Sequence, residues 1–128
     1  MTELTERVII AVTLIAAALA VSITSLICVN RNTEKLISFL EQAEEQYLAD
    51  EDYSHAIDSA VALWNEKRAV FGILLKHADT DEIDRYFHKI ETYRAADSAD
   101  GLFDAAEDCR AALIVMLSGE QPKPGNIF

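Results

Sequence analysis

The stretch that decides the fold is Val8 to Val29, VIIAVTLIAAALAVSITSLICV, which holds no charged residue. A helix of these 22 residues is about 33 Å long at about 1.5 Å per residue, close to the roughly 30 Å hydrocarbon core of a bilayer. Its Ser and Thr hydroxyls can bond back to the preceding helical turn, so lipid tolerates them. The stretch therefore predicts one transmembrane helix, residues 8–29, held by the membrane lipid bilayer and preceded by a short flank, residues 1–7.

A cleaved signal peptide is the alternative for this segment, since Ala18-Leu19-Ala20 fits the small-x-small cleavage pattern. Cleavage there would leave the mostly apolar Val21 to Val29 at the new N-terminus. The flank before the apolar stretch holds one Arg and two Glu, which is a weak basic region for a signal peptide. These features favour an anchor that is retained.

Flanking charges do not decide the orientation of this helix, because Arg7 and the free amine on one side balance Arg31 and Lys35 on the other. A short chain with an N-terminal anchor most often leaves its C-terminal domain outside. We therefore expect a single-pass protein of the cell membrane with an extracytoplasmic domain. Small residues four apart, such as Ala16 and Ala20, also offer a face for helix pairing and leave a homodimer open.

The rest of the chain is strongly acidic. Of the 22 Asp and Glu residues, 20 follow Val29, and only 10 Lys and Arg accompany them. Such a surface repels nucleic acid and anionic lipid headgroups, because both carry phosphate charge of the same sign. We therefore expect no nucleic-acid partner.

Beyond the anchor, apolar residues recur at helical spacing in four stretches, residues 33–49, 53–78, 79–96 and 102–118. No Gly or Pro separates the first stretch from the anchor, so one continuous helix is expected to run through both. The third opens on Asp79 with Glu82 three residues later, which is the outline of a capping box. Trp64 has the largest apolar side chain and is expected at the centre of the core.

The apolar stripes predict which side chains form this core. They comprise Leu36, Leu40, Ala43, Tyr47, Tyr53, Ala56, Ile57, Ala60, Leu63, Trp64, Phe71, Leu74, Leu75, Ile83, Tyr86, Phe87, Ile90, Tyr93, Phe103, Ala106, Cys109, Leu113, Met116 and Leu117. The first two stretches resemble the last two at an offset of 46, which pairs Tyr47 with Tyr93 and Ile57 with Phe103.

The predicted fold class is all-α. An N-terminal transmembrane helix is followed by an acidic four-helix bundle, residues 30–119, made of two helical hairpins that are tetratricopeptide-like at most. Residues 120–128 contain both prolines and are expected to form an extended tail.

A divalent metal could find ligands around His77, Asp84 and His88, because residues 84 and 88 share a helix face and His77 ends the preceding helix. A structural reading competes with it. Acids gather at helix N-termini and His suits a C-terminus through the helix dipole, while Asp84 and His88 form an ordinary i, i+4 pair. We keep these residues only as metal candidates and predict no metal or other cofactor.

No arrangement of residues predicts catalysis. Carboxylate pairs can be drawn anywhere in so acidic a chain, and the sequence has no Gly-rich phosphate loop. Ser54-His55 begins a helix without a strained nucleophile turn. Cys28 lies in the apolar stretch and Cys109 on an inward helix face, so the two are not expected to form a disulfide.

Several landmarks follow one another along the chain: the N-terminal anchor, Trp64, a His77-x-Asp79 turn running into Glu82-Ile83-Asp84, an acidic turn before the fourth helix, and the ending Asn126-Ile127-Phe128. In this combination the chain resembles an uncharacterised, domain-of-unknown-function family of small membrane proteins from clostridia-like Gram-positive bacteria. The resemblance implies a single-pass helical protein with its domain outside the cytoplasm, and it carries over no catalytic residue.

The C-terminal residues Asn126, Ile127 and Phe128 are candidate interaction residues, because the two apolar side chains would fold back onto the bundle or dock on a partner. The leading hypothesis is a membrane-anchored, non-enzymatic protein–protein interaction or scaffold module that binds a membrane or envelope protein. The alternative is an extracytoplasmic domain that senses a ligand or a divalent metal. A hydrolase is a third possibility and would need convergent polar groups in a pocket.

Overall fold

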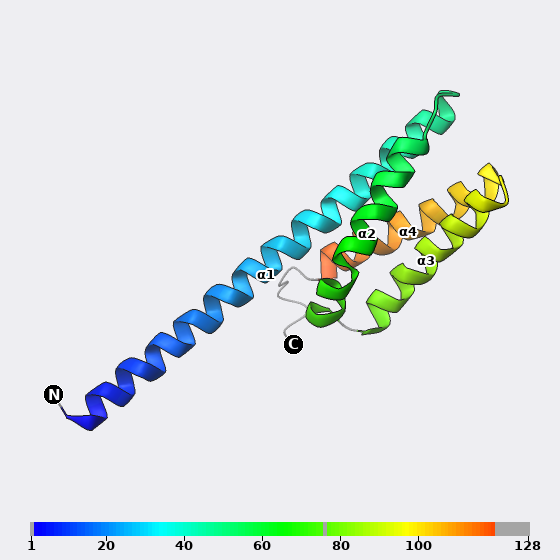
Figure 1. The fold of residues 1–128 in the computed structure, drawn as a ribbon. Coiled ribbons are helices and arrows are strands. Elements are labelled where there is room, and N and C mark those ends of the chain that lie inside the picture. Colours follow the sequence, from blue (N-terminus) through cyan, green and yellow to red (C-terminus); the bar gives the residue numbers. More distant parts are fainter. Residues whose placement is uncertain (1, 76, 120–128) are drawn as a thin grey trace. The chain divides into compact units, whose positions relative to one another are not determined.

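The computed structural model describes residues 2–75 and 77–119, with the backbone alone at His77. It contains four helices, α1 (Glu3–Leu48), α2 (Ser54–Leu74), α3 (His77–Ala95) and α4 (Ala99–Gly119) (Figure 1). No strand occurs within the described ranges, so the predicted all-α class is confirmed. The chain divides into two compact units, residues 1–30 and 31–128, and the division falls within α1.

The first unit is the apolar part of α1. Its side chains are exposed over residues 8–24 of the predicted anchor, and three of its hydroxyls bond back to the helix as expected. Thr13, Ser22 and Thr24 each donate to the carbonyl oxygen four residues earlier, at 2.8, 2.9 and 2.8 Å. Helix α1 is long and apolar enough to span a membrane. It also continues without a break from the apolar stretch to Leu48, as the missing Gly and Pro predicted.

The second unit is a helical bundle. Residues 31–48 of α1 form one hairpin with α2, and α3 forms the other with α4. The buried apolar side chains come from all four segments, and among the largest are Leu36, Leu40, Ile57, Trp64, Phe71, Ile83, Ile90, Leu102 and Leu113. Most of the predicted stripe is confirmed as core, whereas Leu74 and Tyr93 are 40% and 38% exposed.

The two hairpins share one turn design. An Asp with positive φ lies two residues after the end of both α1 and α3, Asp50 at 60° and Asp97 at 55°. In each case the N–H of the next residue donates to the carbonyl oxygen five residues earlier, Glu51 to Gln46 at 2.8 Å and Ser98 to Tyr93 at 2.9 Å. This pattern is a Schellman motif in which Asp takes the left-handed position that is usually Gly.

The equivalence of the hairpins differs from the predicted uniform offset of 46. Asp50 and Asp97 occupy equivalent positions in the two turns, which corresponds to an offset of 47. The buried residues before the turns, such as Leu40 and Phe87, show the same offset. After the turns the offset is 45, as between Ile57 and Leu102. The cause is turn length, since residues 49–53 join the first pair of helices and only residues 96–98 join the second.

Three predicted helix boundaries are wrong. Helix α2 ends at Leu74 rather than residue 78, because Leu75 has extended backbone with φ −116° and ψ 168°. Helix α3 begins at His77, so Asp79 lies in its first turn and is not its N-cap. Helix α4 begins at Ala99, three residues earlier than expected, because the Leu102 N–H already donates to the Ser98 carbonyl oxygen at 3.0 Å.

Candidate interaction site

Aromatic rings join the end of α1 to the start of α4. The Tyr47 ring stacks on Phe103 with centroids 4.2 Å apart, and Tyr53 meets both rings edge-on at 5.8 and 4.8 Å. The Tyr47 hydroxyl donates to Asp100 Oδ1 at 2.8 Å. This hydrogen bond, helped by burial, raises the pKa of Tyr47 because ionisation would remove the donated proton beside a carboxylate. The cluster fixes the position of the first hairpin turn against α4.

An open groove of about 440 Å³ lies between the start of α2, the end of α3 and the start of α4. Ile57 and Leu102 give it an apolar floor, and its polar lining includes Asp52, Asp58 and Asp97. Among the described residues, Arg94 is the one Lys or Arg that lines it.

Two of the groove carboxylates are already held by the protein. Arg94 on α3 forms an ion pair with Asp58 on α2. Asp52 Oδ1 accepts the Ser54 N–H at 3.0 Å, and this backbone hydrogen bond lowers the pKa of Asp52. An acidic groove with an apolar floor suits the side chain of Lys or Arg, whose charged head and apolar stem prefer different surroundings.

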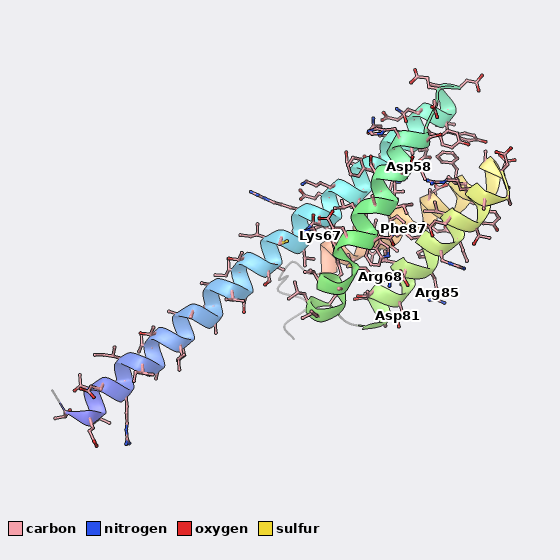
Figure 2. The ribbon with its side chains drawn as sticks, viewed as in Figure 1. Asp58, Lys67, Arg68, Asp81, Arg85 and Phe87 are labelled. Atoms are coloured by element: carbon pink, nitrogen blue, oxygen red, sulfur yellow. The ribbon has the colours of Figure 1, made fainter. Side chains whose placement is uncertain are left out.

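Charge is divided unevenly between the two ends of the bundle. We name as the acidic half the part that holds both hairpin turns, residues 41–64 and 86–107, which carries twelve Asp and Glu and two Lys and Arg. The remaining described part, residues 31–40, 65–75, 77–85 and 108–119, is the neutral half. It carries seven Asp and Glu and six Lys and Arg. Figure 2 shows Asp58 toward the turn end of α2 and Lys67 and Arg68 farther along that helix.

The metal candidate Asp84 has a structural role. Its Oδ1 accepts the Trp64 Nε1–H at 2.9 Å and lies 3.3 Å from Arg68. Trp64 is 1% exposed and stacks on Phe87 with centroids 5.5 Å apart, so its predicted place at the centre of the core is confirmed.

The other metal candidates do not complete a site in the part of the chain that the structure describes. His88 is exposed on α3, and the side chain of His77 lies outside the described residues. No group of three or more His, Cys, Asp and Glu with metal-binding spacing occurs among the described side chains. The candidate interaction residues Asn126, Ile127 and Phe128 also lie outside the described residues.

Among the described residues, neither Cys28 nor Cys109 forms a disulfide. Cys109 is fully buried in the core, and this burial raises the pKa of its thiol to about 12. It therefore packs as a small apolar residue and offers no reactive thiolate.

Sequence reasoning missed the groove and the uneven charge of the bundle. The signal is present in the sequence, since Asp50-Glu51-Asp52 and the acidic run from Asp97 fall in the gaps between the predicted helical stretches. In an up-and-down bundle of two hairpins, both turns lie at the same end, so the two acidic runs must meet there.

Comparison with protein families matches residues 23–113 to a family described as a domain of unknown function, DUF4363. The chain belongs to this family. The match runs from the apolar part of α1 to Leu113 on α4, so it includes Trp64, both hairpin turns and the groove. A family of unknown function agrees with the resemblance seen in the sequence. Comparisons with curated proteins and with solved structures found no match.

Proposed function

We propose that this chain is a single-pass protein of the cell membrane whose extracytoplasmic bundle is a non-enzymatic interaction module. Residues 8–29 anchor it in the bilayer. The acidic half then binds a cationic segment of a membrane or envelope protein. The sequence resemblance adds that such chains belong to clostridia-like Gram-positive bacteria, and this source is part of the proposal.

The anchor is supported by the exposed apolar length of α1. Large side chains such as Ile15, Leu19 and Val21 are 58–66% exposed along it. In water a continuous apolar surface of this length would be unfavourable, while a bilayer accommodates it. The hydroxyls of Thr13, Ser22 and Thr24 are satisfied by hydrogen bonds within the helix, so lipid does not leave them without a partner.

The observation that carries the proposed binding is the charge of the acidic half. This half carries twelve acids against two bases, and three of the acids, Asp52, Asp58 and Asp97, line a groove whose floor is apolar. Such a field attracts a basic partner and raises its rate of association, while the groove offers a place for one long basic side chain. The groove's Asp52 and Asp58 hold Ser54 and Arg94 in place, which supports a binding role over a catalytic one.

A charge-removal experiment tests this binding. The variant Asp50→Asn/Asp52→Asn/Asp97→Asn removes three charges, and Asn tolerates both the left-handed turn position and the helix cap. The matched control Glu34→Gln/Glu66→Gln/Asp81→Asn removes three exposed charges from the neutral half. Each full-length chain is purified from native membranes in mild detergent at low and at high salt, and co-purifying proteins are quantified by mass spectrometry.

We expect the Asp50→Asn/Asp52→Asn/Asp97→Asn variant and high salt each to reduce the recovery of the same basic partner several-fold. The control variant should recover as much of it as the natural chain does. Equal recovery of every co-purifying protein with both variants contradicts the proposal. Anchoring is measured separately by extraction of membranes at alkaline pH, which should leave the chain in the membrane pellet. Labelling of Leu48→Cys in intact cells with an impermeant maleimide tests the orientation, and labelling only after lysis contradicts an extracytoplasmic bundle.

The alternative of a ligand- or metal-sensing domain stays a prediction. Among the described residues nothing favours it, because Asp84 is engaged by Trp64 and Arg68. Calorimetry of the full chain with Zn²⁺, Ca²⁺ and Mn²⁺ tests it, and heat of binding with a raised melting temperature would support it.

A further inference from the structure

Exposed apolar side chains gather at one end of the bundle. We name as the apolar collar Val70, Ile73 and Leu74 of α2 with Ile114 and Val115 of α4. Ile73 is 82% exposed and Val115 is 70% exposed. Within the described acidic half, the large apolar side chains exposed to a similar degree are Leu48 and Tyr93. Apolar exposure is therefore concentrated in the neutral half.

The chain topology explains why the collar residues lie at the same end. Helices α2 and α4 follow their turns in the same sense, so both C-terminal ends lie opposite the hairpin turns (Figure 1). The part of α1 in the second unit begins at Arg31, and this residue also lies at the end opposite the hairpin turns. Only Asn30 separates Arg31 from the predicted anchor along the chain.

We propose that the apolar collar docks on the lipid surface of the membrane. This inference rests on the proposed function, because it requires residues 8–29 to span the bilayer. A collar on two helix ends suits a planar apolar layer, in which exposed side chains of an amphipathic surface enter the boundary between headgroups and acyl chains.

The distribution of charge favours the same end, because the neutral half is repelled less by anionic headgroups than the acidic half. The neutral half has nearly as many bases as acids, while the acidic half would be repelled by anionic headgroups. Lys67 and Arg68 precede the collar residues along α2 and lie 3.8 Å from Glu66 and 3.3 Å from Asp84, and Lys35 lies one turn after Arg31 on α1. Asp79 and Asp81 at the start of α3 belong to the same half. Long basic side chains can extend their charged ends to lipid phosphates while their stems lie on apolar surface. The orientation that buries the collar in lipid therefore also places the acidic half away from the membrane.

Nitroxide labels on the full-length chain in vesicles test the docking. Cys28→Ala is made throughout, and Cys109 stays because it is buried and unreactive. Single labels are introduced by Ile73→Cys and Val115→Cys in the collar, Leu48→Cys in the acidic half and Ile15→Cys in the anchor. All four positions are exposed in the structure, so no core contact is removed. Relative accessibility to oxygen and to a polar nickel chelate is measured in phosphatidylcholine vesicles with and without phosphatidylglycerol.

We expect a several-fold higher ratio of oxygen to nickel accessibility at positions 73 and 115 than at position 48, in both kinds of vesicle. If positions 73 and 115 match position 48 while position 15 reports lipid, the anchor stands and the docking is overturned. If position 15 also reports water, the proposed function fails with it. Immobilised labels at 73 and 115 with low access to both reagents would show a protein contact, from a second copy or residues 120–128, and would also overturn docking on lipid.

Discussion

The Trp64 indole N–H donates to Asp84 Oδ1 across 2.9 Å, linking a fully buried aromatic ring of α2 to a half-exposed carboxylate on α3. The bond explains how the core accepts a polar indole nitrogen without an unsatisfied donor. It also assigns a structural role to a residue whose position alone had suggested a metal ligand.

Loss of this acceptor should destabilise the bundle. We expect Asp84→Ala to lower the free energy of unfolding by about 1–3 kcal/mol, because the Trp64 N–H would lose its charged partner. Asp84→Asn keeps an acceptor oxygen and should cost less. The measurement is urea unfolding followed by circular dichroism in detergent. Arg68→Ala serves as the control, since an exposed ion pair is worth about 0–1 kcal/mol. An equal loss in Asp84→Ala and Asp84→Asn would contradict this role.

Substitution of the two helical glycines, Gly72 and Gly101, by alanine should change the stability of the bundle in opposite directions. A Cβ on Gly72 would meet nothing within 4 Å, so Gly72→Ala should stabilise α2 by about 0.5–1 kcal/mol. A Cβ on Gly101 would lie 2.4 Å from Tyr93 Cδ1, so Gly101→Ala should destabilise the second hairpin. Thermal unfolding of both variants checks the signs. The Gly101 effect should become stabilising in a Tyr93→Ala background, and persistence of the loss there would show another cause.

The raised pKa of Tyr47 predicts a change in stability at alkaline pH. Its hydrogen bond to Asp100 favours the neutral phenol in the folded state. The resulting stability is fully present below the ordinary pKa of 10.0 and is lost as the pH rises through the higher folded pKa. Tyr47→Phe should therefore be less stable than the natural chain at neutral pH, and its stability should fall less steeply above pH 10. Urea unfolding across this range makes the comparison.

Tyr86 needs a parallel variant in that experiment, because burial raises its pKa as well. Tyr86→Phe should also make the alkaline loss shallower, but it leaves the link between α1 and α4 intact. Identical alkaline profiles for Tyr47→Phe and the natural chain would rule out a contribution from the bond to Asp100.

The buried thiol of Cys109 should resist alkylation. Its pKa of about 12 leaves almost no thiolate at neutral pH, and the side chain is fully buried. In a Cys28→Ala chain, maleimide should react only after unfolding in urea, which mass spectrometry of the intact protein will show. Fast reaction of the folded chain would mean that the core opens readily around α4.

The sequence predicted the core well because helical spacing records burial directly. Leu36, Leu40, Ile57, Ile83 and Ile90 were all expected inside and are buried. The long apolar segment and its continuity into the bundle followed from composition and from the absence of Gly and Pro. These properties depend on neighbours along one helix, which is the information that periodicity carries.

Helix ends were predicted less well, because each depends on contacts that the local sequence does not show. The predicted third and fourth stretches leave residues 97–101 between them, whereas only residues 96–98 lie between α3 and α4. Gly101 is helical and allows the Tyr93 ring to approach the backbone of α4. Likewise, the acidic residues from Asp79 predicted a helix start at residue 79, whereas α3 begins two residues earlier, at His77.

The groove and the apolar collar could not be predicted from periodicity. Both depend on which helix ends meet in space, and therefore on the pairing of distant segments. Ile73 and Val115, for example, lie off the apolar stripes of the second and fourth stretches and are exposed, but periodicity does not show that their two helix ends meet in space. The metal candidate Asp84 shows the same limit. Its hydrogen-bond partner Trp64 lies on α2 and could not be predicted from the sequence of α3 alone.

The uneven distribution of charge makes the bundle an electric dipole along its own axis. An approaching cationic molecule experiences a torque before any contact forms, so it arrives already oriented toward the hairpin turns. Salt shortens the reach of this field to about 8 Å at physiological ionic strength, and capture should then depend on encounters that are already close. In kinetic terms, dilution of the surrounding electrolyte should accelerate association far more than it slows dissociation.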